Sequence, residues 1–478
     1  METWDRIRYL GRISLIFSTT LFLQWQPSFT RPLPDSISLA LVGGRLIDGY
    51  GGSPLENSII LISGSTIRSI GKVGQLQVPP EAQVIDTNGM TVLPGLWESH
   101  GHLFHIGEAD PNRFQERFSQ QIPEIMASIA KVTLSAGVTA VREFCTTCSA
   151  TSQEWRSPLF EQQQELRGKI NRSELPGPRL YFSGPILSQA THPTRRDNAF
   201  QVGTVAEARR ATEQLIAMGV DNVFAGAEQW KPDLLEAITE AAHAASMGVD
   251  AEARDMKTLR TVIAAGVDRV HVFFTTDVLA DYSDAELRLL VRGFNPIASG
   301  PSANILRGPW VLSTLAMRQT YVDVLEFPEL LDHPRFRSMF SPELYRDLRS
   351  GWRNPQAIPW GIGAAQRVGV VKRKLKRFIE AGGREQLIAA TDAGAPLNFH
   401  SPLPKQLRYL VEAGLTPMEA IQSATLRPAQ MQGVFDSLGT VSIGKLADLI
   451  VVDGDPLQEI EVLQYGVVHV IRGGEVFK

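Results

Sequence analysis

The sequence has only two cysteines among its 478 residues, Cys145 and Cys148, in a single Cys-Thr-Thr-Cys segment. A metal site built from cysteines usually needs a second such pair, so this segment does not predict one. In an oxidising compartment the two thiols would form a local disulfide, and in the cytosol they would stay free.

The sequence also lacks an excess of charge of either sign. It has 47 Lys and Arg against 51 Asp and Glu, which gives a net charge of −4, and both signs are dispersed along the chain. This distribution provides no electrostatic footprint for nucleic acid. We therefore expect no nucleic-acid partner.

No apolar run is long enough to span a bilayer comfortably. The longest near the start, 13–23, follows Arg6, Arg8 and Arg12 and suits the hydrophobic region of a signal peptide. The bulky segment 24–27 offers no small-residue cleavage site, so an uncleaved membrane anchor is the alternative. We expect an exported protein, periplasmic or extracellular, with possible membrane attachment through its N-terminus.

The most informative segment that is present is the apolar run 92–99, which ends in His100-Gly101-His102. Alternate residues of a strand project to the same face, so the two imidazoles would point together at the end of this strand. Two neutral imidazoles that converge form half of a site for Zn²⁺ or a similar ion.

The residues around this pair resemble the amidohydrolase superfamily, in its imidazolonepropionase-like and prolidase-like branch. The lead-in Val84-Ile85-Asp86 … Leu93-Pro94-Gly95-Leu96 is similar to the approach to the first barrel strand of that family. Three further segments fit the family in the same order: 136–143 (AGVTAVRE), 390–394 (ATDAG) and 438–452 (LGTV leading into GKLADLIVV). The resemblance extends from about Ser36 to the C-terminus.

The predicted fold is α/β, with a (β/α)₈ TIM-like barrel and a small composite β-sandwich built from both chain ends. Short alternating strands separated by turns predict the β-rich ends, and the centre alternates strands with helices. Thr416-Pro417-Met418-Glu419 predicts a helix start with a capping box. The segment 282–360 is expected to hold long loops and extra helices over the barrel mouth. The predicted division is 1–34 as signal peptide or anchor with linker, 35–93 and 438–478 as the sandwich, and 94–437 as the barrel.

Resemblance to two-metal members of the family implies a His pair, a bridging carboxylated Lys, two further His and an Asp. His100, His102 and Asp392 match the two ends of that set. Phe224 stands where the bridging Lys is expected, and Lys231 lies too far along the chain to replace it. Phenylalanine has no ligand atom, so a two-metal site with a carbamate bridge is excluded.

The two middle histidines of the set are also replaced. Glu252 occupies the third ligand position, and a carboxylate can bind Zn²⁺ or Mn²⁺, although an ion-paired surface Glu is equally compatible. Val272 occupies the fourth. His271 is adjacent, and strand alternation predicts that it faces the helices unless a bulge re-aims it. His105 is either another source of a nitrogen ligand or a solvated loop histidine.

Three nearby residues have predicted supporting roles. Arg142 and Glu143 end the second predicted strand and are either groups behind the site or a buried ion pair that holds the barrel layers together. His400 is expected to orient Asp392 or to line the pocket.

The family resemblance, together with these residues, implies a small-molecule substrate and a hydrolase of amide or cyclic-amide C–N bonds, dipeptides included. One divalent metal is expected, zinc first and manganese or iron as alternatives, with His100, His102, Glu252 and Asp392 as ligands. Asp392 would also shuttle the proton. The alternative is an inactive barrel that serves as a binding or scaffold protein.

Overall fold

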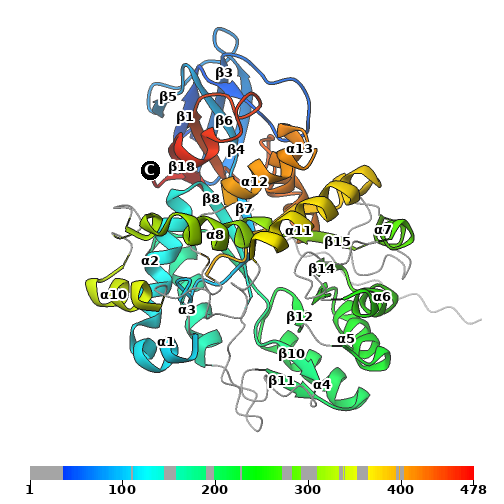
Figure 1. Ribbon diagram of the computed structural model, residues 1–478. Helices are drawn as coiled ribbons and strands as arrows, with labels where there is room; N and C mark the ends of the chain where they lie inside the picture. Colours follow the sequence, from blue (N-terminus) through cyan, green and yellow to red (C-terminus); the bar gives the residue numbers. More distant parts are fainter. Residues whose placement is uncertain are drawn as a thin grey trace, which may run out of the picture. The chain divides into compact units, whose positions relative to one another are not determined.

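Strands from the two ends of the chain lie together in the computed structural model (Figure 1). The structure describes residues 36–108, 111–144, 158–189, 199–226, 229–253, 255–271, 283–291, 309–332, 337, 340–351, 364–394, 398 and 403–478. Within these ranges, no helix combines the length and the apolar composition that crossing a bilayer requires. Residues 37–478 form one compact unit.

The N-terminal strands build most of two small sheets. They are β1 (Leu39–Val42), β2 (Arg45–Leu46), β3 (Ser58–Ser63), β4 (Thr66–Lys72), β5 (Gln83–Asp86) and β6 (Met90–Pro94). One sheet has the order β4-β3-β1-β5, with β1 antiparallel to β3 and parallel to β5. The short strands predicted for the N-terminal end are confirmed by β1, β3, β4 and β5.

The second sheet takes strands from both chain ends. The C-terminal strands are β17 (Leu449–Asp453), β18 (Val467–Arg472) and β19 (Glu475–Val476), and the sheet order is β19-β18-β17-β6-β2. Strand β17 is antiparallel to β6, with Leu449 opposite Pro94. Leu41, Ile60 and Val451 are buried in one apolar cluster between the sheets. Burial of these side chains is the driving force that joins segments more than 350 residues apart.

The centre of the chain forms parallel sheets, which makes this region α/β. A three-stranded sheet has the order β7-β8-β9, and a seven-stranded sheet has the order β11-β10-β12-β13-β14-β15-β16. The strands are β7 (Leu96–Gly101), β8 (Val138–Glu143), β9 (Arg179–Phe182), β10 (Leu187–Gln189), β11 (Phe200–Val202), β12 (Val223–Ala225), β13 (Val249–Glu252), β14 (Arg269–His271), β15 (Trp310–Ser313) and β16 (Leu387–Ala389). Neighbouring strands in both sheets run parallel to each other.

Helices alternate with these strands and pack against them (Figure 1). They are α1 (Pro111–Phe118), α2 (Ile122–Ser135), α3 (Pro158–Asn171), α4 (Val205–Ala217), α5 (Pro232–Ala244), α6 (Met256–Ala264), α7 (Asp284–Val291), α8 (Leu315–Glu326), α10 (Pro342–Gly351), α11 (Ala364–Glu380), α12 (Leu403–Glu412), α13 (Pro417–Ser423), α14 (Leu426–Met431) and α15 (Val462–Tyr465), with short 3₁₀ turns at Ser119–Gln121, Pro328–Asp332 and Gly383–Glu385. The capping box of α13 is confirmed, since Thr416 accepts from the Glu419 backbone and the Glu419 carboxylate accepts from Thr416 N.

One expectation about the centre of the chain is incomplete. The segment 282–360 holds more than the expected loops and extra helices, because it also supplies β15, which pairs with both β14 and β16. Trp310-Val311-Leu312-Ser313 is buried throughout. A four-residue apolar run is too short for its periodicity to distinguish a buried strand from a loop.

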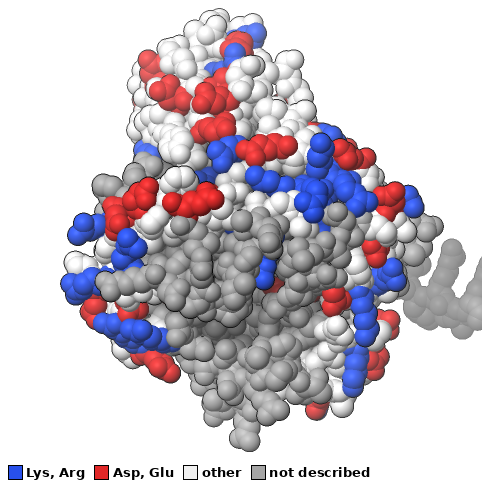
Figure 2. Space-filling view, in the orientation of Figure 1, with Lys and Arg blue, Asp and Glu red and all other residues white. Residues whose placement is uncertain are grey.

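On the face drawn in Figure 2, acidic and basic side chains of the described residues are interspersed.

Candidate metal centre

The ends of β7 and β16 meet through their backbones, and this contact positions three polar side chains. Asp392 N donates to the His100 carbonyl over 2.8 Å, and His102 N donates to the Ala393 carbonyl over 2.8 Å. The segment after β16 therefore runs beside the end of β7, with Gly101 and Ala393 as parallel bridge partners. This pairing brings Asp392 next to His100 and His102, which lie about 290 positions earlier.

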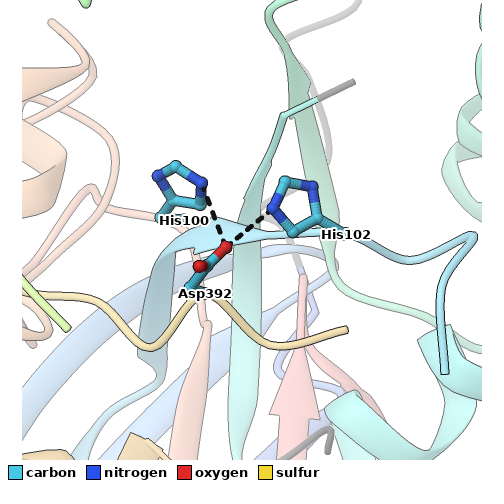
Figure 3. Close-up of side chains that lie close together, drawn as sticks. All are labelled: His100, His102 and Asp392. Carbon is cyan, nitrogen blue, oxygen red and sulfur yellow. Dashed lines mark hydrogen bonds and ion pairs between the residues drawn. The ribbon is translucent and has the colours of Figure 1, made fainter. Parts of the chain in front are cut away.

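The three side chains converge, as Figure 3 shows. His102 Nε2 lies 2.8 Å and His100 Nε2 lies 3.4 Å from Asp392 Oδ1. One potential ligand atom from each residue lies within 4.8 Å of the others. Both imidazoles are 2 % exposed and Asp392 is 8 % exposed. Among the described residues, this is the group whose spacing could hold a metal ion.

The backbone at Asp392 has an uncommon conformation. Its φ is +59°, a left-handed value that costs a non-glycine residue free energy unless its surroundings enforce it. Asn398 supplies that support, because its side-chain amide donates to the carbonyls of Thr391 and Asp392 over 2.7 and 2.6 Å. Sequence reasoning missed Asn398, since no motif or spacing distinguishes it.

Each histidine has a partner on its other ring nitrogen. His102 Nδ1 contacts the carbonyl oxygen of Phe144. His100 Nδ1 lies 2.8 Å from Nδ1 of His271. Metal-binding histidines are generally held in this way, with one nitrogen fixed by a hydrogen bond and the other directed at the ion.

A family model described as the amidohydrolase family matches residues 91–477. This span covers most of the chain. The chain belongs to the amidohydrolase family. The predicted family, and with it an amidohydrolase-family hydrolase acting on carbon–nitrogen bonds, is confirmed.

Known relatives of this amidohydrolase differ in the substrates that they are named for. It is 24 % identical to N-acyl-D-glutamate deacylase of Alcaligenes xylosoxydans xylosoxydans over 472 residues, which cover 88 % of each chain. It is 34 % identical to imidazolonepropionase of Geobacillus kaustophilus (strain HTA426) over 104 residues, 21 % of this chain and 24 % of the relative. A solved Xaa-Pro dipeptidase with bound methionine matches with a TM-score of 0.68 and 24 % identity, over 92 % of this chain and 99 % of that one. The structural likeness shows the fold.

An aromatic wall occupies the place expected for the bridging lysine of two-metal amidohydrolases. The ring of Phe224 lies near that of His100, with centroids 6.1 Å apart. It also packs edge-on against Phe144, with ring centroids 4.9 Å apart. Phe144 in turn stacks on His100, with centroids 4.2 Å apart and planes 14° from parallel. Lys231 lies exposed at the start of α5. This wall packs the site but offers no ligand atom.

The predicted orientation of His271 is wrong. That prediction requires Val270 and Val272 to face the site, which would turn His271 toward the helices. The register pairs Asp250 with Arg269 and Glu252 with His271, so His271 shares a face with Asp250 and reaches His100. His271 is fully buried. Alternation fixes relative orientation only, and the pairing with β13 decides which set of residues faces inward.

Glu252 and His105 lie outside the group of three. Glu252 ends β13, is partly exposed, and shares its face of the sheet with His271. Its role as a metal ligand stays a prediction. His105 is buried and contacts the carboxylate of Glu108 through Nδ1.

Arg142 and Glu143 do not form the buried ion pair that is one of their two predicted roles. Arg142 donates to Asp250 over 2.7 Å, whereas Glu143 accepts from the Leu103 backbone over 2.7 Å and from Gln163 over 3.0 Å. Consecutive strand residues point to opposite faces, so these two side chains cannot meet.

Burial and neighbouring charges set the protonation of these groups. Burial, together with the neighbouring His271, His102 and Arg142, lowers the pKa of His100 well below its ordinary value, so its ring is neutral. Burial opposes protonation of His102, but its contact with Asp392 raises its pKa overall. Burial raises the pKa of Glu98 to about 7 and that of Glu143 to about 8.

Several predictions fall outside the described residues: the N-terminal segment 1–34, Cys145 and Cys148, His400, and Val272.

Proposed function

We propose that this amidohydrolase is a metal-dependent hydrolase that cleaves amide or cyclic-amide C–N bonds in small molecules with a single divalent ion. The observation that carries the proposal is the convergence of His100, His102 and Asp392 at the buried junction of β7 and β16. Dipeptides are included in the proposed substrate class.

The donor set fits a catalytic zinc ion. Catalytic zinc sites use three protein ligands of the histidine and carboxylate type and keep a further position open. Two imidazole nitrogens and one carboxylate oxygen are at hand here, and Mn²⁺ or Fe²⁺ would be compatible with the same donors. Such an ion, when bound, would supply a Lewis acid that lowers the pKa of water and polarises a carbonyl.

The chain's own residues supply positioning and proton transfer. Asp392 would accept a proton from the attacking water and return it to the departing amine nitrogen. Its carboxylate is held between two imidazoles, and its backbone is fixed by Asn398. A carboxylate that is already in place loses little freedom when the reaction occurs, which favours this role.

The proposal of one ion is supported by Phe224, whose ring stands near His100 where a bridging ligand would be needed. Glu252 is proposed as an additional ligand, because it shares its face of the sheet with His271 and a carboxylate can bind zinc. Replacing Glu252 by Gln should then weaken metal binding.

We propose that the two parallel sheets close into a (β/α)₈ barrel over residues 94–437. Two contacts between the sheets support closure: the Gly101–Ala393 bridge, and the hydrogen bond of 2.7 Å from Asp221 N to the Phe182 carbonyl. We also propose that residues 35–93 and 438–478 form a composite β-sandwich, which the sheet shared by β6 and β17 supports.

The sequence supports a further proposal, that the protein is exported and is either cleaved or retained at a membrane by residues 1–34. Fractionation of the expressing cells, with immunodetection of a C-terminal tag, tests it. Recovery of full-length chain in the cytosol alone would overturn it.

Metal content is the test of the proposed function. The full-length protein, loaded with Zn²⁺ and desalted, should retain about one ion per chain by mass spectrometry. The His100→Ala/His102→Ala variant should retain none. Failure of the unaltered protein to retain any ion would overturn the hydrolase proposal and favour a binding or scaffold role.

Activity then tests Asp392. With the zinc-loaded protein and a panel of N-acyl amino acids and dipeptides, Asp392→Asn should lower kcat by roughly 10²- to 10⁴-fold, because the amide accepts no proton. An Asp392→Asn variant that keeps both zinc and full activity would show that Asp392 is not the proton shuttle.

A further inference from the structure

We propose that His271 and Asp250 are a positioning pair that orients His100 for metal binding. In this arrangement His271 accepts a hydrogen bond from Nδ1 of His100, which leaves the lone pair of His100 Nε2 directed at the metal position. The inference rests on the proposed metal-dependent function and gives His271 a role there as a non-ligand.

Asp250 is the fixed end of this chain of contacts. Its Oδ2 accepts from Arg142 over 2.7 Å, Arg269 over 3.2 Å and Asn222 over 3.1 Å. Its Oδ1 lies 3.4 Å from Nε2 of His271. Asp250 and His271 are fully buried. The three donors on Oδ2 therefore hold the carboxylate with its other oxygen facing the imidazole.

The chemistry of these groups assigns each proton. Asp250 forms buried ion pairs with Arg142 at 2.7 Å and with Arg269 at 3.2 Å, so its side chain is present as the carboxylate. An ionised carboxylate only accepts, so His271 Nε2 must be the donor. In the proposed arrangement the N–H of the His271 ring is on Nε2, and Nδ1 is its acceptor.

The same logic extends to His100. Its Nδ1 lies 2.8 Å from the acceptor nitrogen of His271, so Nδ1 of His100 must carry the proton. Its Nε2 then carries no proton, and this nitrogen is the one that faces Asp392 at 3.4 Å. The protonation chain thus runs from Asp250 through His271 to His100.

His102 is oriented by a backbone group instead of a second imidazole, and in this structure its Nε2 donates to the Asp392 carboxylate. Its Nδ1 contacts the Phe144 carbonyl, which only accepts, and its Nε2 faces Asp392 at 2.8 Å. Both histidines thereby present Nε2 to one point. A backbone carbonyl fixes one ring and an imidazole fixes the other.

The contact between the two Nδ1 atoms also argues that His271 is not itself a ligand beside His100. Two nitrogens bound to one tetrahedral ion at about 2.0 Å would lie roughly 3.3 Å apart. The observed 2.8 Å is a hydrogen-bond distance, and it involves the nitrogen of His100 that does not face Asp392.

Two substitutions of His271 separate a positioning role from a structural one. In His271→Asn the side-chain oxygen takes the place of Nδ1 and can accept from His100, whereas His271→Phe fills the volume without an acceptor. Zn²⁺ affinity of the full-length protein is measured by competition with a chromophoric chelator. His271→Phe should raise the dissociation constant about 10- to 100-fold, and His271→Asn should recover most of this loss.

The matched control is His243→Gln, which removes another histidine–aspartate pair, His243 with Asp268 at 2.9 Å. It should leave Zn²⁺ affinity unchanged. Circular dichroism and thermal unfolding check that each variant folds. A purely structural role predicts the opposite order, with Phe tolerated better than Asn between Phe144 and Phe224, and that order would overturn the proposal.

Two spectroscopic measurements complete the test. In the metal-free protein labelled with ¹⁵N-histidine, long-range ¹H–¹⁵N NMR should identify His100 as the Nδ1–H tautomer; the Nε2–H tautomer would overturn the inference. X-ray absorption of the zinc-loaded protein should show two imidazoles, and a third would make His271 a ligand. If the unaltered protein binds no Zn²⁺, the proposed function fails, whereas unchanged binding in His271→Phe removes only this inference.

Discussion

Arg142 and Glu143 are consecutive residues of β8, yet they belong to different parts of the molecule. Arg142 joins the buried polar cluster around Asp250, while Glu143 accepts hydrogen bonds from the Leu103 backbone and from Gln163. Glu143 is 1 % exposed and has no cation among these partners. The protonation state of Glu143 therefore affects the free energy of unfolding.

Glu143→Gln should change how stability depends on pH. Burial raises the pKa of Glu143 from 4.5 to about 8 in the folded protein. Between these values the folded state holds a proton that the unfolded state has released, so unfolding free energy falls as pH rises, by up to about 1.4 kcal/mol per pH unit. Urea unfolding at pH 5, 6, 7 and 8 should show this slope reduced in Glu143→Gln.

The control for Glu143 is Glu213→Gln on α4, where the side chain is exposed. It should leave the slope unchanged. An identical pH dependence in the unaltered protein and Glu143→Gln would show that Glu143 is ionised at neutral pH.

The turn that follows β16 is the element that completes the site. It carries Asp392 and then Gly394, whose φ is +92°. A Cβ on Gly394 would lie 2.3 Å from the His102 carbonyl oxygen and 3.1 Å from the His102 Cβ. This close approach of two backbones is possible only without a side chain, so the turn and the end of β7 are fitted to each other.

Gly394→Ala should therefore damage the site as well as the fold. We expect a loss of roughly 2–4 kcal/mol in unfolding free energy, from the left-handed φ and from the clash, and a Zn²⁺ affinity at least about 10-fold weaker. Chemical unfolding and chelator competition measure the two effects.

Gly266→Ala is the control that separates the cost of a left-handed backbone from the cost of a steric clash. Gly266 has a φ of +75°, but a Cβ at this position would meet no atom of a residue beyond its chain neighbours within 4 Å in the described part of the chain. Only the cost of the backbone conformation therefore applies. This variant should lose about 1 kcal/mol and keep its metal affinity. Equal Zn²⁺ affinity in Gly394→Ala and Gly266→Ala would show that the close approach of the turn after β16 to the end of β7 is not needed for metal binding.

At the scale of the whole molecule, a long-range ion pair joins the three-stranded central sheet to the sheet shared by the chain ends. Arg179 of β9 forms two hydrogen bonds with Asp448, at 2.7 and 2.9 Å, just before β17. Asp448 also accepts from Gly473 N at 2.7 Å, and its side chain is 5 % exposed. A single buried carboxylate thus ties three segments together.

Arg179→Met should destabilise the protein by roughly 2–4 kcal/mol, because it leaves Asp448 buried without its cation. Arg172→Met removes the exposed pair with Glu174 and should change the free energy of unfolding much less, because water and salt screen exposed charges. Urea unfolding followed by tryptophan fluorescence and by circular dichroism measures both. Equal losses in the two variants would show that the Arg179–Asp448 pair adds no more than a surface contact.

Much of the architecture follows from local sequence signals. The short strands of both ends, the capping box at Thr416 and Glu419, and the pairing of His100 with His102 on one strand end depend on spacing within a few residues. The position of Phe224 in the chain is enough to show that the bridging lysine is absent. The residues on either side of Asp392 are enough to identify it as a candidate site residue.

The tertiary structure decided what depends on contacts between distant strands. Whether His271 or its neighbours face the site is set by the register of β14 against β13, and the partner of Arg142 is set by the approach of Asp250 from another sheet. The convergence of Asp392 with His100 likewise depends on the turn after β16. A sequence contains the alternation of a strand, but the inward-facing set is chosen only when its neighbours pair with it.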